Sequence, residues 1–269
     1  MNNSKLKAVI FDWAGTTVDF GCMAPTGVFI EVFRQKGIEI SISEARGPMG
    51  MHKRDHIATI ASYPRVASLW LETHGKACGQ EDISEMFNNF IPLQMSVIKS
   101  HADIIPGVLE AVEEIRLRGL KIGSSTGYNN EMMDILVAEA AKSGYKPDAV
   151  VCATDVPAGR PAPWMAFKNA ELLGVYPMKN ILKVGDTIAD IEEGLNAGMW
   201  SAGVVVSGNE MGLTQDELNM LTTMQLELKK EEIREKFYQA GAHFVIDTMD
   251  QIPWLLDEVE KRLQAGLKP

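Results

Sequence analysis

The chain has 269 residues, a formal net charge of -10, and a composition that is 46% hydrophobic and 23% charged. This length and hydrophobic content suit one large globular domain, or a core with an inserted module, rather than a disordered or fibrous chain. The acidic balance argues against a nucleic-acid backbone or an anionic membrane as the main partner, although it leaves room for a small anionic substrate in a locally cationic cleft.

The first predicted element is a buried strand at Ala8–Phe11, where four apolar residues precede Asp12 and a Gly-Thr-Thr turn. Asp12 therefore emerges at the carboxyl end of the strand, which is where open α/β sheets carry their chemistry. A carboxylate at that place can act as a nucleophile or a metal ligand. An isolated Asp in such a turn is equally typical of an Asx-turn, so later segments must decide.

Residues 20–100 predict helices and no strand. Apolar residues recur at helical spacing in four segments: Pro25–Lys36, Ser43–Ala61, Pro64–Gly75 and Asp82–Ser100. We therefore expect an all-helical insertion with short joins near residues 20–22 and 100–106.

One stretch of this insertion carries a candidate reactive amine. Pro48 suits a helix start, which would place Met49, Lys53 and His56 on one face of that helix. A Lys that shares a face with Met can be partly desolvated and nucleophilic at neutral pH. Most lysines on helices are solvated surface charges, and that simpler interpretation stays open at this point.

From residue 106 onward, strands and helices alternate. The predicted strands are Lys121–Ser125, Ala149–Cys152, Ile181–Val184, Ser201–Val206 and His243–Asp247. The predicted helices are Gly107–Arg118, Asn130–Ser143, Pro163–Leu173, Ile188–Asn196 and Met249–Ala265, with a polar, solvated helical region at Thr214–Ala240. The alternation predicts an α/β fold with a doubly wound, mostly parallel, Rossmann-like sheet. We expect a core of residues 1–20 and 101–269 and a helical domain of residues 21–100.

Three further strand ends carry polar residues. The strand at Ile122 ends in Ser-Ser-Thr-Gly, so Thr126 and Gly127 offer a hydroxyl and backbone N–H groups. Arg160 lies in a loop bounded by Pro and Gly. The strand at Ile181 ends in Gly-Asp-Thr-Ile-Ala-Asp, which places Asp186 as Asp12 is placed and puts Asp190 four residues later.

These strand ends together predict one site. Asp12, Asp186 and Asp190 form a cluster of hard oxygen ligands suited to Mg²⁺. Thr126 and Arg160 suit the phosphate that Mg²⁺ would accompany.

The four motifs, in this order, resemble those of the haloacid dehalogenase superfamily of phosphotransferases. The helical insertion lies between the first and second motifs, where that superfamily carries its cap domain. Most phosphatases of the superfamily have a second Asp two residues after the nucleophile, which protonates an oxygen leaving group, but this chain has Ala14 there. An ester phosphatase without that acid would lose about 10²–10⁴ in rate, which points to a leaving atom other than oxygen.

Longer stretches, Phe11–Cys22, Pro48–Gly50 with Lys53, and Val156–Pro161, look like the phosphonatase branch of that superfamily. The resemblance implies a Mg²⁺-dependent hydrolase that splits the carbon–phosphorus bond of phosphonoacetaldehyde into acetaldehyde and phosphate. It implies that Lys53 forms a Schiff base with the aldehyde and that Asp12 becomes an aspartyl-phosphate.

The same resemblance assigns the remaining roles. Mg²⁺ would be held by Asp12, Asp186 and the backbone carbonyl of Ala14, with Asp190 orienting a metal-bound water. The expected substrate-binding and phosphate-binding residues are Thr126, Gly127, Arg160, Met49, His56, Tyr128 and Cys22. A homodimer formed through the cap is also implied.

Two observations concern the compartment. The cysteines, Cys22, Cys78 and Cys152, are too few and too scattered for a disulfide framework. Asp12 interrupts the first apolar run, so we recognise no signal peptide and expect a cytoplasmic protein with a small-molecule phosphonate as its partner. The alternatives are another hydrolase of the superfamily, either a phosphatase or a dehalogenase, and an inactive binding scaffold.

Overall fold

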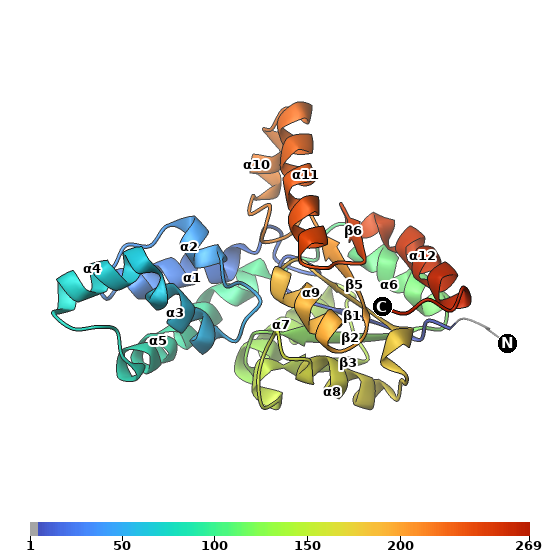
Figure 1. Cartoon of the computed structure of the whole chain (residues 1–269), viewed down its shortest axis with the longest axis horizontal. Coiled ribbons are helices and arrows are strands. Elements are labelled where there is room, and N and C mark those ends of the chain that lie inside the picture. Colours follow the sequence, from blue (N-terminus) through green and yellow to red (C-terminus); the bar gives the residue numbers. More distant parts are fainter. Residues whose placement is uncertain (1–4) are drawn as a thin grey trace.

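The computed structural model describes residues 5–269, and its centre is a six-stranded sheet (Figure 1). The strands are β1 (Ala8–Phe11), β2 (Lys121–Thr126), β3 (Ala149–Cys152), β4 (Ile181–Gly185), β5 (Trp200–Val204) and β6 (Phe244–Ile246). Their order is β3-β2-β1-β4-β5-β6, and each neighbouring pair is parallel. The predicted doubly wound parallel sheet is confirmed, with identical bounds for β1 and β3 and bounds that differ by one or two residues for the other strands.

The strand order reverses at β1. Phe11 pairs with Ser124 of β2 on one side and with Val184 of β4 on the other. In such sheets the crevice at the carboxyl ends of the two strands that flank the reversal is where ligands bind. The Asp12 N–H donates to the Val184 carbonyl at 3.0 Å, so the residues after β1 and β4 open into this crevice.

Helices cover both faces of the sheet. One face carries α6 (Val108–Leu117), α7 (Asn130–Lys142) and α12 (Ile252–Gln264), and the other carries α8 (Trp164–Leu173), α9 (Ile188–Asn196) and α11 (Thr223–Gln239). Alternate side chains of β1 divide between them, because successive residues of a strand point to opposite faces. Val9 and Phe11 join the larger apolar cluster, and Ala8 and Ile10 pack with α8. Short 3-10 turns occupy Lys99–His101, Ala153–Asp155, Met178–Asn180 and Met249–Gln251.

A helical cap interrupts the chain between β1 and β2. It consists of α1 (Met23–Arg34), α2 (Ile42–Arg46), α3 (Lys53–Ser62), α4 (Pro64–His74) and α5 (Gln80–Ile98). These helices lie together at one end of the molecule (Figure 1). Phe29, Phe33 and Phe90 are fully buried among them, in an apolar cluster that continues into the core. The all-helical insertion is confirmed, while the exact boundary between the two parts stays a prediction.

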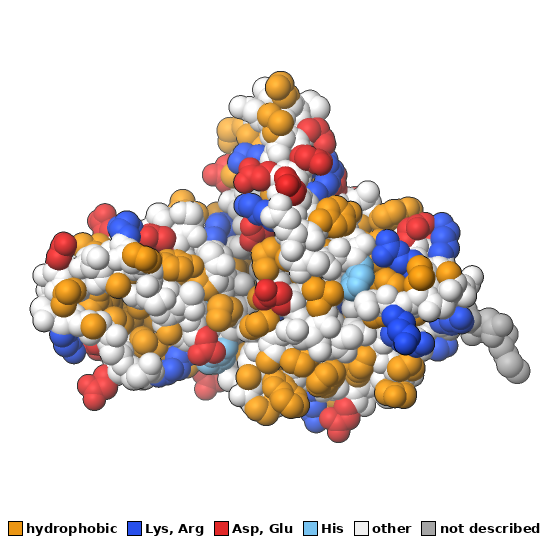
Figure 2. Space-filling model, in the orientation of Figure 1, with side chains coloured by type: hydrophobic (Ala, Val, Ile, Leu, Met, Phe, Trp, Pro, Cys, Tyr) orange, Lys and Arg blue, Asp and Glu red, His pale blue; other side chains and the backbone are white. Residues whose placement is uncertain are grey.

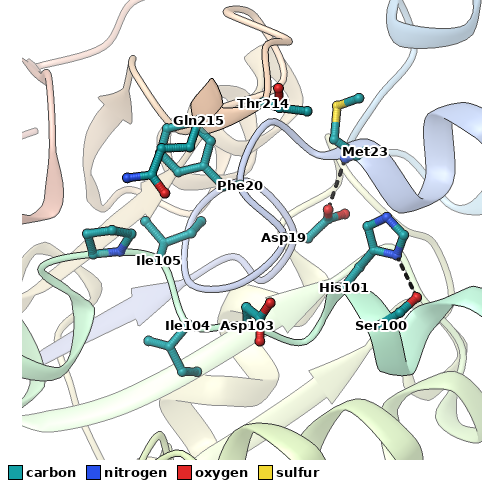
Figure 3. A pocket seen from close by; sticks show the side chains of 11 residues that line it. Asp19, Phe20, Met23, Ser100, His101, Asp103, Ile104, Ile105, Thr214 and Gln215 are labelled. Atoms are coloured by element: carbon teal, nitrogen blue, oxygen red, sulfur yellow. Dashed lines mark hydrogen bonds between the residues drawn. The ribbon is translucent and has the colours of Figure 1, made fainter. Parts of the chain in front are cut away.

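The two linkers between cap and core run side by side. The Asp19 N–H donates to the Asp103 carbonyl at 3.3 Å, and the Ile105 N–H donates to the Thr17 carbonyl at 3.0 Å. The Asp19 carboxylate accepts the Met23 N–H at 3.0 Å and so caps the first turn of α1 (Figure 3). A pocket of about 410 Å³ opens beside these residues. The paired linkers form the junction between the cap and the core.

The prediction of a helix over Ser43–Ala61 is wrong. The chain forms α2 and α3 instead, separated by a turn over residues 47–52. Gly50 has φ 89°, a left-handed conformation that no helix tolerates, and Pro48 lies in the turn rather than at a helix start. α3 begins at Lys53, so Met49 precedes this helix and does not share its face.

The polar region expected at Thr214–Ala240 forms α10 (Gln215–Asn219) and α11, which project from the body and carry charged side chains (Figures 1 and 2). Ile233 and Phe237 are the buried residues of α11, and both belong to an apolar cluster that includes Ile191 of α9. Among residues 5–269, no helix has the length and apolarity needed to cross a bilayer.

Candidate active site

Three carboxylates converge where the strand order reverses. Asp12 follows β1, Asp186 follows β4, and Asp190 lies in the first turn of α9. One oxygen atom of each lies within 4.8 Å of the others, and all three side chains are buried. Elements far apart in the chain therefore supply a single acidic cluster.

The first turn of α9 fixes the position of Asp190. The Thr187 hydroxyl accepts the Asp190 N–H at 3.2 Å, and it also donates to Asp190 Oδ2 at 2.6 Å. The Thr187 N–H donates to the same carboxylate oxygen at 3.3 Å. This reciprocal capping box satisfies free N–H groups at the helix start and holds the carboxylate in one orientation.

Asp186 is the carboxylate that most needs a cation. Its Oδ1 accepts the Thr16 hydroxyl at 2.7 Å, and its Oδ2 accepts the Asn209 N–H at 2.8 Å. Within the described part of the chain no Lys or Arg lies within ion-pair distance of it. Burial, followed by the charges of Asp12 and Asp190, raises the pKa of Asp186 well above its usual range. A hard divalent cation fits this donor set, because it would neutralise clustered carboxylate oxygens.

Arg160 balances the negative charges of the other two carboxylates in the cluster, Asp12 and Asp190. Its guanidinium is buried and pairs with Asp12 Oδ1 at 2.8 Å, with Asp190 Oδ1 at 3.0 Å and with Glu193 Oε2 at 2.9 Å. Burial alone would lower the pKa of Arg160, but the three carboxylates raise it. Burial raises the pKa of Asp12, and Arg160 opposes that rise. The guanidinium thus favours the charged form of Asp12 and limits the rise in its pKa.

Sequence reasoning missed a second buried cation. Lys183 of β4 is fully buried, and its Nζ lies 2.7 Å from Asp190 Oδ1 and 3.3 Å from Glu193 Oε2. The same ammonium donates to the Ser125 hydroxyl at 3.1 Å. The sequence contains a sign of this cation, because Lys183 is a charged residue inside an otherwise apolar strand. Its second partner could also be inferred, because Glu193 lies three residues after Asp190 on the same face of α9.

Lys53 lies across the crevice, at the start of α3. It is 4% exposed, and its Nζ lies 5.5 Å from the centroid of the Phe29 ring, 5.0 Å from that of Tyr128, and 4.0 Å from Met49 Sδ. No carboxylate of residues 5–269 is within ion-pair distance of it. Burial lowers the pKa of Lys53 from about 10.5 to about 8. Such an amine is partly neutral, and hence nucleophilic, near physiological pH.

Most of the predicted residues meet around one narrow cavity of about 20 Å³ between cap and core. Its lining consists of Asp12, Ala14, Cys22, Pro25, Met49, Gly50, Lys53, Thr126, Gly127, Tyr128, Arg160 and Thr187. A space of this size holds about one water molecule. A molecule larger than water would fit here only if the cap turn lay farther from the core.

Two glycines allow the cap turn to contact the core closely. A Cβ at Gly50 would lie 2.5 Å from Thr187 Oγ1, and a Cβ at Gly127 would lie 2.5 Å from the Met51 carbonyl. Larger side chains at either position would hold the turn away from the carboxyl ends of β2 and β4.

Three of the predicted site residues do not line the cavity: His56, Asp186 and Asp190. The two carboxylates belong to the acidic cluster described above. His56 is fully buried; its ring stacks on Phe29 at 3.7 Å between centroids, and its Nε2 lies 2.8 Å from the Ala45 carbonyl. Burial lowers the pKa of His56 well below its usual value, so the ring is neutral.

Two lining residues are neutral groups. Burial raises the pKa of the Cys22 thiol well above its usual value, which argues against thiolate chemistry. Burial likewise raises the pKa of Tyr128 well above its usual value. The Tyr128 hydroxyl accepts a hydrogen bond from Gln94 Nε2 at 3.2 Å, which ties α5 of the cap to the turn after β2.

These features together define a class of hydrolase. The parallel sheet carries a helical cap, Asp12 directly follows β1, Arg160 lies in the segment between β3 and α8, and Asp186 and Asp190 follow β4. A family model described as haloacid dehalogenase-like hydrolase matches residues 6–198. The chain belongs to this family.

Individual relatives narrow the comparison. The chain is 48% identical over 258 residues to the phosphonoacetaldehyde hydrolase of Bacillus cereus (strain B4264), an alignment that covers 96% of this chain and 98% of that protein. It is 47% identical, with the same coverage, to the phosphonoacetaldehyde hydrolase of Bacillus thuringiensis (strain Al Hakam). Among solved structures, a phosphonoacetaldehyde hydrolase like protein from Oleispira antarctica superposes with a TM-score of 0.97 at 40% identity, covering 98% of this chain and 96% of that one. The resemblance to the phosphonatase branch is confirmed.

Proposed function

We propose that the chain hydrolyses the carbon–phosphorus bond of phosphonoacetaldehyde to give acetaldehyde and phosphate. The observation that carries this proposal is the buried amine of Lys53 in the same narrow cavity as the carboxylate of Asp12. The substrate named in the relatives contains an aldehyde for the first group and a phosphoryl group for the second. Ala14, which replaces the acid of ester phosphatases, agrees with a leaving atom that is carbon.

The reaction begins at Lys53. Its neutral amine attacks the aldehyde carbon, the carbonyl oxygen leaves as water, and an iminium ion forms on Nζ. With a pKa of about 8, roughly a tenth of the amine is neutral at about pH 7, against about one part in three thousand for an ordinary lysine. The apolar surroundings of Lys53 therefore increase the reactive fraction about 300-fold.

Asp12 performs the second step. A carboxylate oxygen of Asp12 attacks phosphorus, the carbon–phosphorus bond breaks, and its electron pair passes to the iminium nitrogen to give an enamine. Without the imine the leaving group would be a localised carbanion. Protonation of the enamine at carbon and hydrolysis of the resulting imine release acetaldehyde and restore Lys53.

Arg160 and Thr126 act on the phosphoryl group. Arg160 already contacts Asp12 Oδ1 at 2.8 Å, so its guanidinium lies where negative charge develops on the transferred group. Thr126 and the N–H of Gly127 line the same cavity and suit the remaining phosphoryl oxygens. Water then hydrolyses the aspartyl-phosphate, which releases phosphate and frees Asp12 for the next turnover.

The acidic cluster is assigned to Mg²⁺. Asp12, Asp186 and the backbone carbonyl of Ala14 would hold the ion, which when bound supplies positive charge to the phosphoryl oxygens. Asp190 pairs with Arg160 and Lys183, so we assign it the role of orienting a water molecule at this site. Met49, His56, Tyr128 and Cys22 are assigned to shaping the pocket around Lys53.

Cap movement completes the proposal. Lys53 belongs to the cap and Asp12 to the core, so closure of residues 21–100 over residues 1–20 and 101–269 assembles the site and excludes water. A homodimer through the cap and a cytoplasmic location remain predictions that rest on the family resemblance.

The test is product release from phosphonoacetaldehyde with Mg²⁺ present. We expect equimolar acetaldehyde and phosphate, and only weak hydrolysis of phosphate monoesters. Lys53→Arg should abolish the reaction, because an arginine forms no imine here, while Lys168→Arg on the exposed face of α8 should leave it unchanged. Faster hydrolysis of esters, or normal turnover by Lys53→Arg, would contradict the proposal.

A further inference from the structure

Arg46, the last residue of α2, is a buried cation that the proposed reaction does not use. The residue is 9% exposed. It donates to the Gly21 carbonyl at 2.8 Å, to Asn209 Oδ1 at 3.2 Å and to the Gly212 carbonyl at 3.3 Å. No carboxylate in the part of the chain that the structure describes pairs with it. Burying such a charge is costly, and here neutral oxygens of the linker and a core loop compensate it.

These contacts join the cap to the loop that follows β5. Asn209 lies in that loop, and its side chain both accepts from the Arg46 guanidinium and donates to the Arg46 carbonyl at 3.3 Å. The backbone N–H of Asn209 donates to Asp186 Oδ2 at 2.8 Å. Asn209 therefore links the Arg46 guanidinium of the cap to the Asp186 carboxylate of the acidic cluster.

The same loop also contacts the turn after β1. The Ser207 hydroxyl donates to the Gly15 carbonyl at 2.8 Å, and the Ser207 carbonyl accepts the Gly21 N–H at 2.8 Å. The loop over residues 207–212 thus contacts the linker, the turn after Asp12, and Asp186 itself. A shift of this loop would be transmitted to both sides of the acidic cluster.

The contact lies at the edge of an open space. A cleft of about 460 Å³ between α2 and the loop is lined by Ile42, Arg46, Asn209 and Lys236, among others. The cleft leaves part of α2 without packing against the loop, and the Arg46 hydrogen bonds cross beside it. Opening of the cap would therefore break the hydrogen bonds between the Arg46 guanidinium and the loop.

We propose that Arg46 is a latch that couples closure of the cap to the affinity of the acidic cluster for its cation. With the cap closed, Arg46 holds Asn209 so that its N–H orients Asp186; with the cap open, that constraint is lost. Cation binding and cap closure then favour each other by the same free energy, as linkage requires. Arg46 is a positioning residue, because it acts through Asn209, and the inference rests on the proposed use of Mg²⁺.

The test measures Mg²⁺ binding to the metal-free, full-length protein by titration calorimetry. Arg46→Met removes the charge and the donors, and we expect Mg²⁺ to bind about 10–100-fold more weakly. Arg65→Met is the matched control, because Arg65 contacts Glu44 and Glu39 within the cap, and we expect its affinity to stay within about twofold. Amide hydrogen exchange at Asn209 should also accelerate in Arg46→Met and not in Arg65→Met.

Two further variants separate the latch from a general loss of structure. Arg46→Lys keeps the charge but loses the planar fork, so its Mg²⁺ affinity should fall between those of the wild type and Arg46→Met. Asn209→Ala should weaken Mg²⁺ binding as much as Arg46→Met does, and the double variant should be no weaker than either single one. If Arg46→Met does not fold, Arg46→Lys and Asn209→Ala test the same coupling.

Unchanged Mg²⁺ affinity and unchanged exchange at Asn209 in a folded Arg46→Met variant would overturn the latch. Strictly additive losses in the double variant would do the same. Either result would leave the proposed hydrolysis intact. If the wild-type protein itself bound no Mg²⁺, both the latch and the proposed use of the metal would be wrong.

Discussion

Replacing Lys53 by Met should inactivate the protein and stabilise it at the same time. Methionine has a similar length and no charge, so it suits the apolar site formed by Phe29, Tyr128 and Met49. The wild-type Lys53 is 4% exposed there, and no carboxylate among residues 5–269 lies within ion-pair distance of its ammonium. Its burial lowers the stability of the fold, although the proposed reaction depends on it.

The magnitude follows from the pKa of Lys53. A value of about 8 in the folded protein, against about 10.5 for an ordinary lysine, corresponds to about 3 kcal/mol of destabilisation at about pH 7. Because the folded pKa is the lower one, the unfolded chain binds more protons between about pH 8 and about pH 10.5. The free energy of unfolding of the wild type therefore rises with pH across that window. By about pH 9.5 the advantage of Lys53→Met should fall to less than half of its value at about pH 7.

The assay is urea unfolding of both proteins at several pH values, with metal removed by a chelator. Lys168→Met on α8 is the matched control, because its side chain is partly exposed and pairs with Glu171 at the surface, and we expect it to change stability by less than about 0.5 kcal/mol. Two results would refute the reasoning: a Lys53→Met variant no more stable than the wild type at neutral pH, or a stability difference that does not depend on pH.

Three other outcomes follow from the site. Asp12→Asn should lower phosphate release at least about 10³-fold, because an amide does not attack phosphorus, and appreciable residual turnover would remove Asp12 from the mechanism. Arg160→Met should lower the free energy of unfolding by about 3–5 kcal/mol, because Asp12, Asp190 and Glu193 lose the guanidinium that they share. A loss below about 1 kcal/mol in urea titration would show that Lys183 alone balances the charges of these carboxylates. Chelation should abolish turnover, and added Mg²⁺ should restore it and raise the melting temperature, whereas full activity in excess chelator would exclude the proposed role of the acidic cluster.

Much of the fold could be predicted because its signals are local. Four apolar residues before Asp12 predict β1 with its observed bounds, and the remaining strands are short apolar runs that end in small or polar residues. The parallel, doubly wound arrangement of the sheet then follows from the alternation of strands and helices. Asp12, Asp186 and Asp190 could be grouped for the same reason, since parallel strands end at one edge.

The errors arise where distant contacts decide the local structure. The break between α2 and α3 depends on Gly50, whose left-handed conformation lets the cap turn contact Thr187, and on Arg46, whose guanidinium bonds to the loop after β5. Helical periodicity carries no information about either contact. The role of Lys183 was missed because its charge is compensated by Asp190 and Glu193, residues that follow it in another element.

The central claim is that Lys53 forms an imine with the substrate, and borohydride reduction tests it most directly. The protein is incubated with phosphonoacetaldehyde, reduced, digested, and analysed by mass spectrometry. We predict a stable secondary amine on Lys53, inactivation in proportion to its formation, and no inactivation by borohydride without substrate. Continued full activity after reduction in the presence of substrate, or modification confined to lysines other than Lys53, would contradict the account.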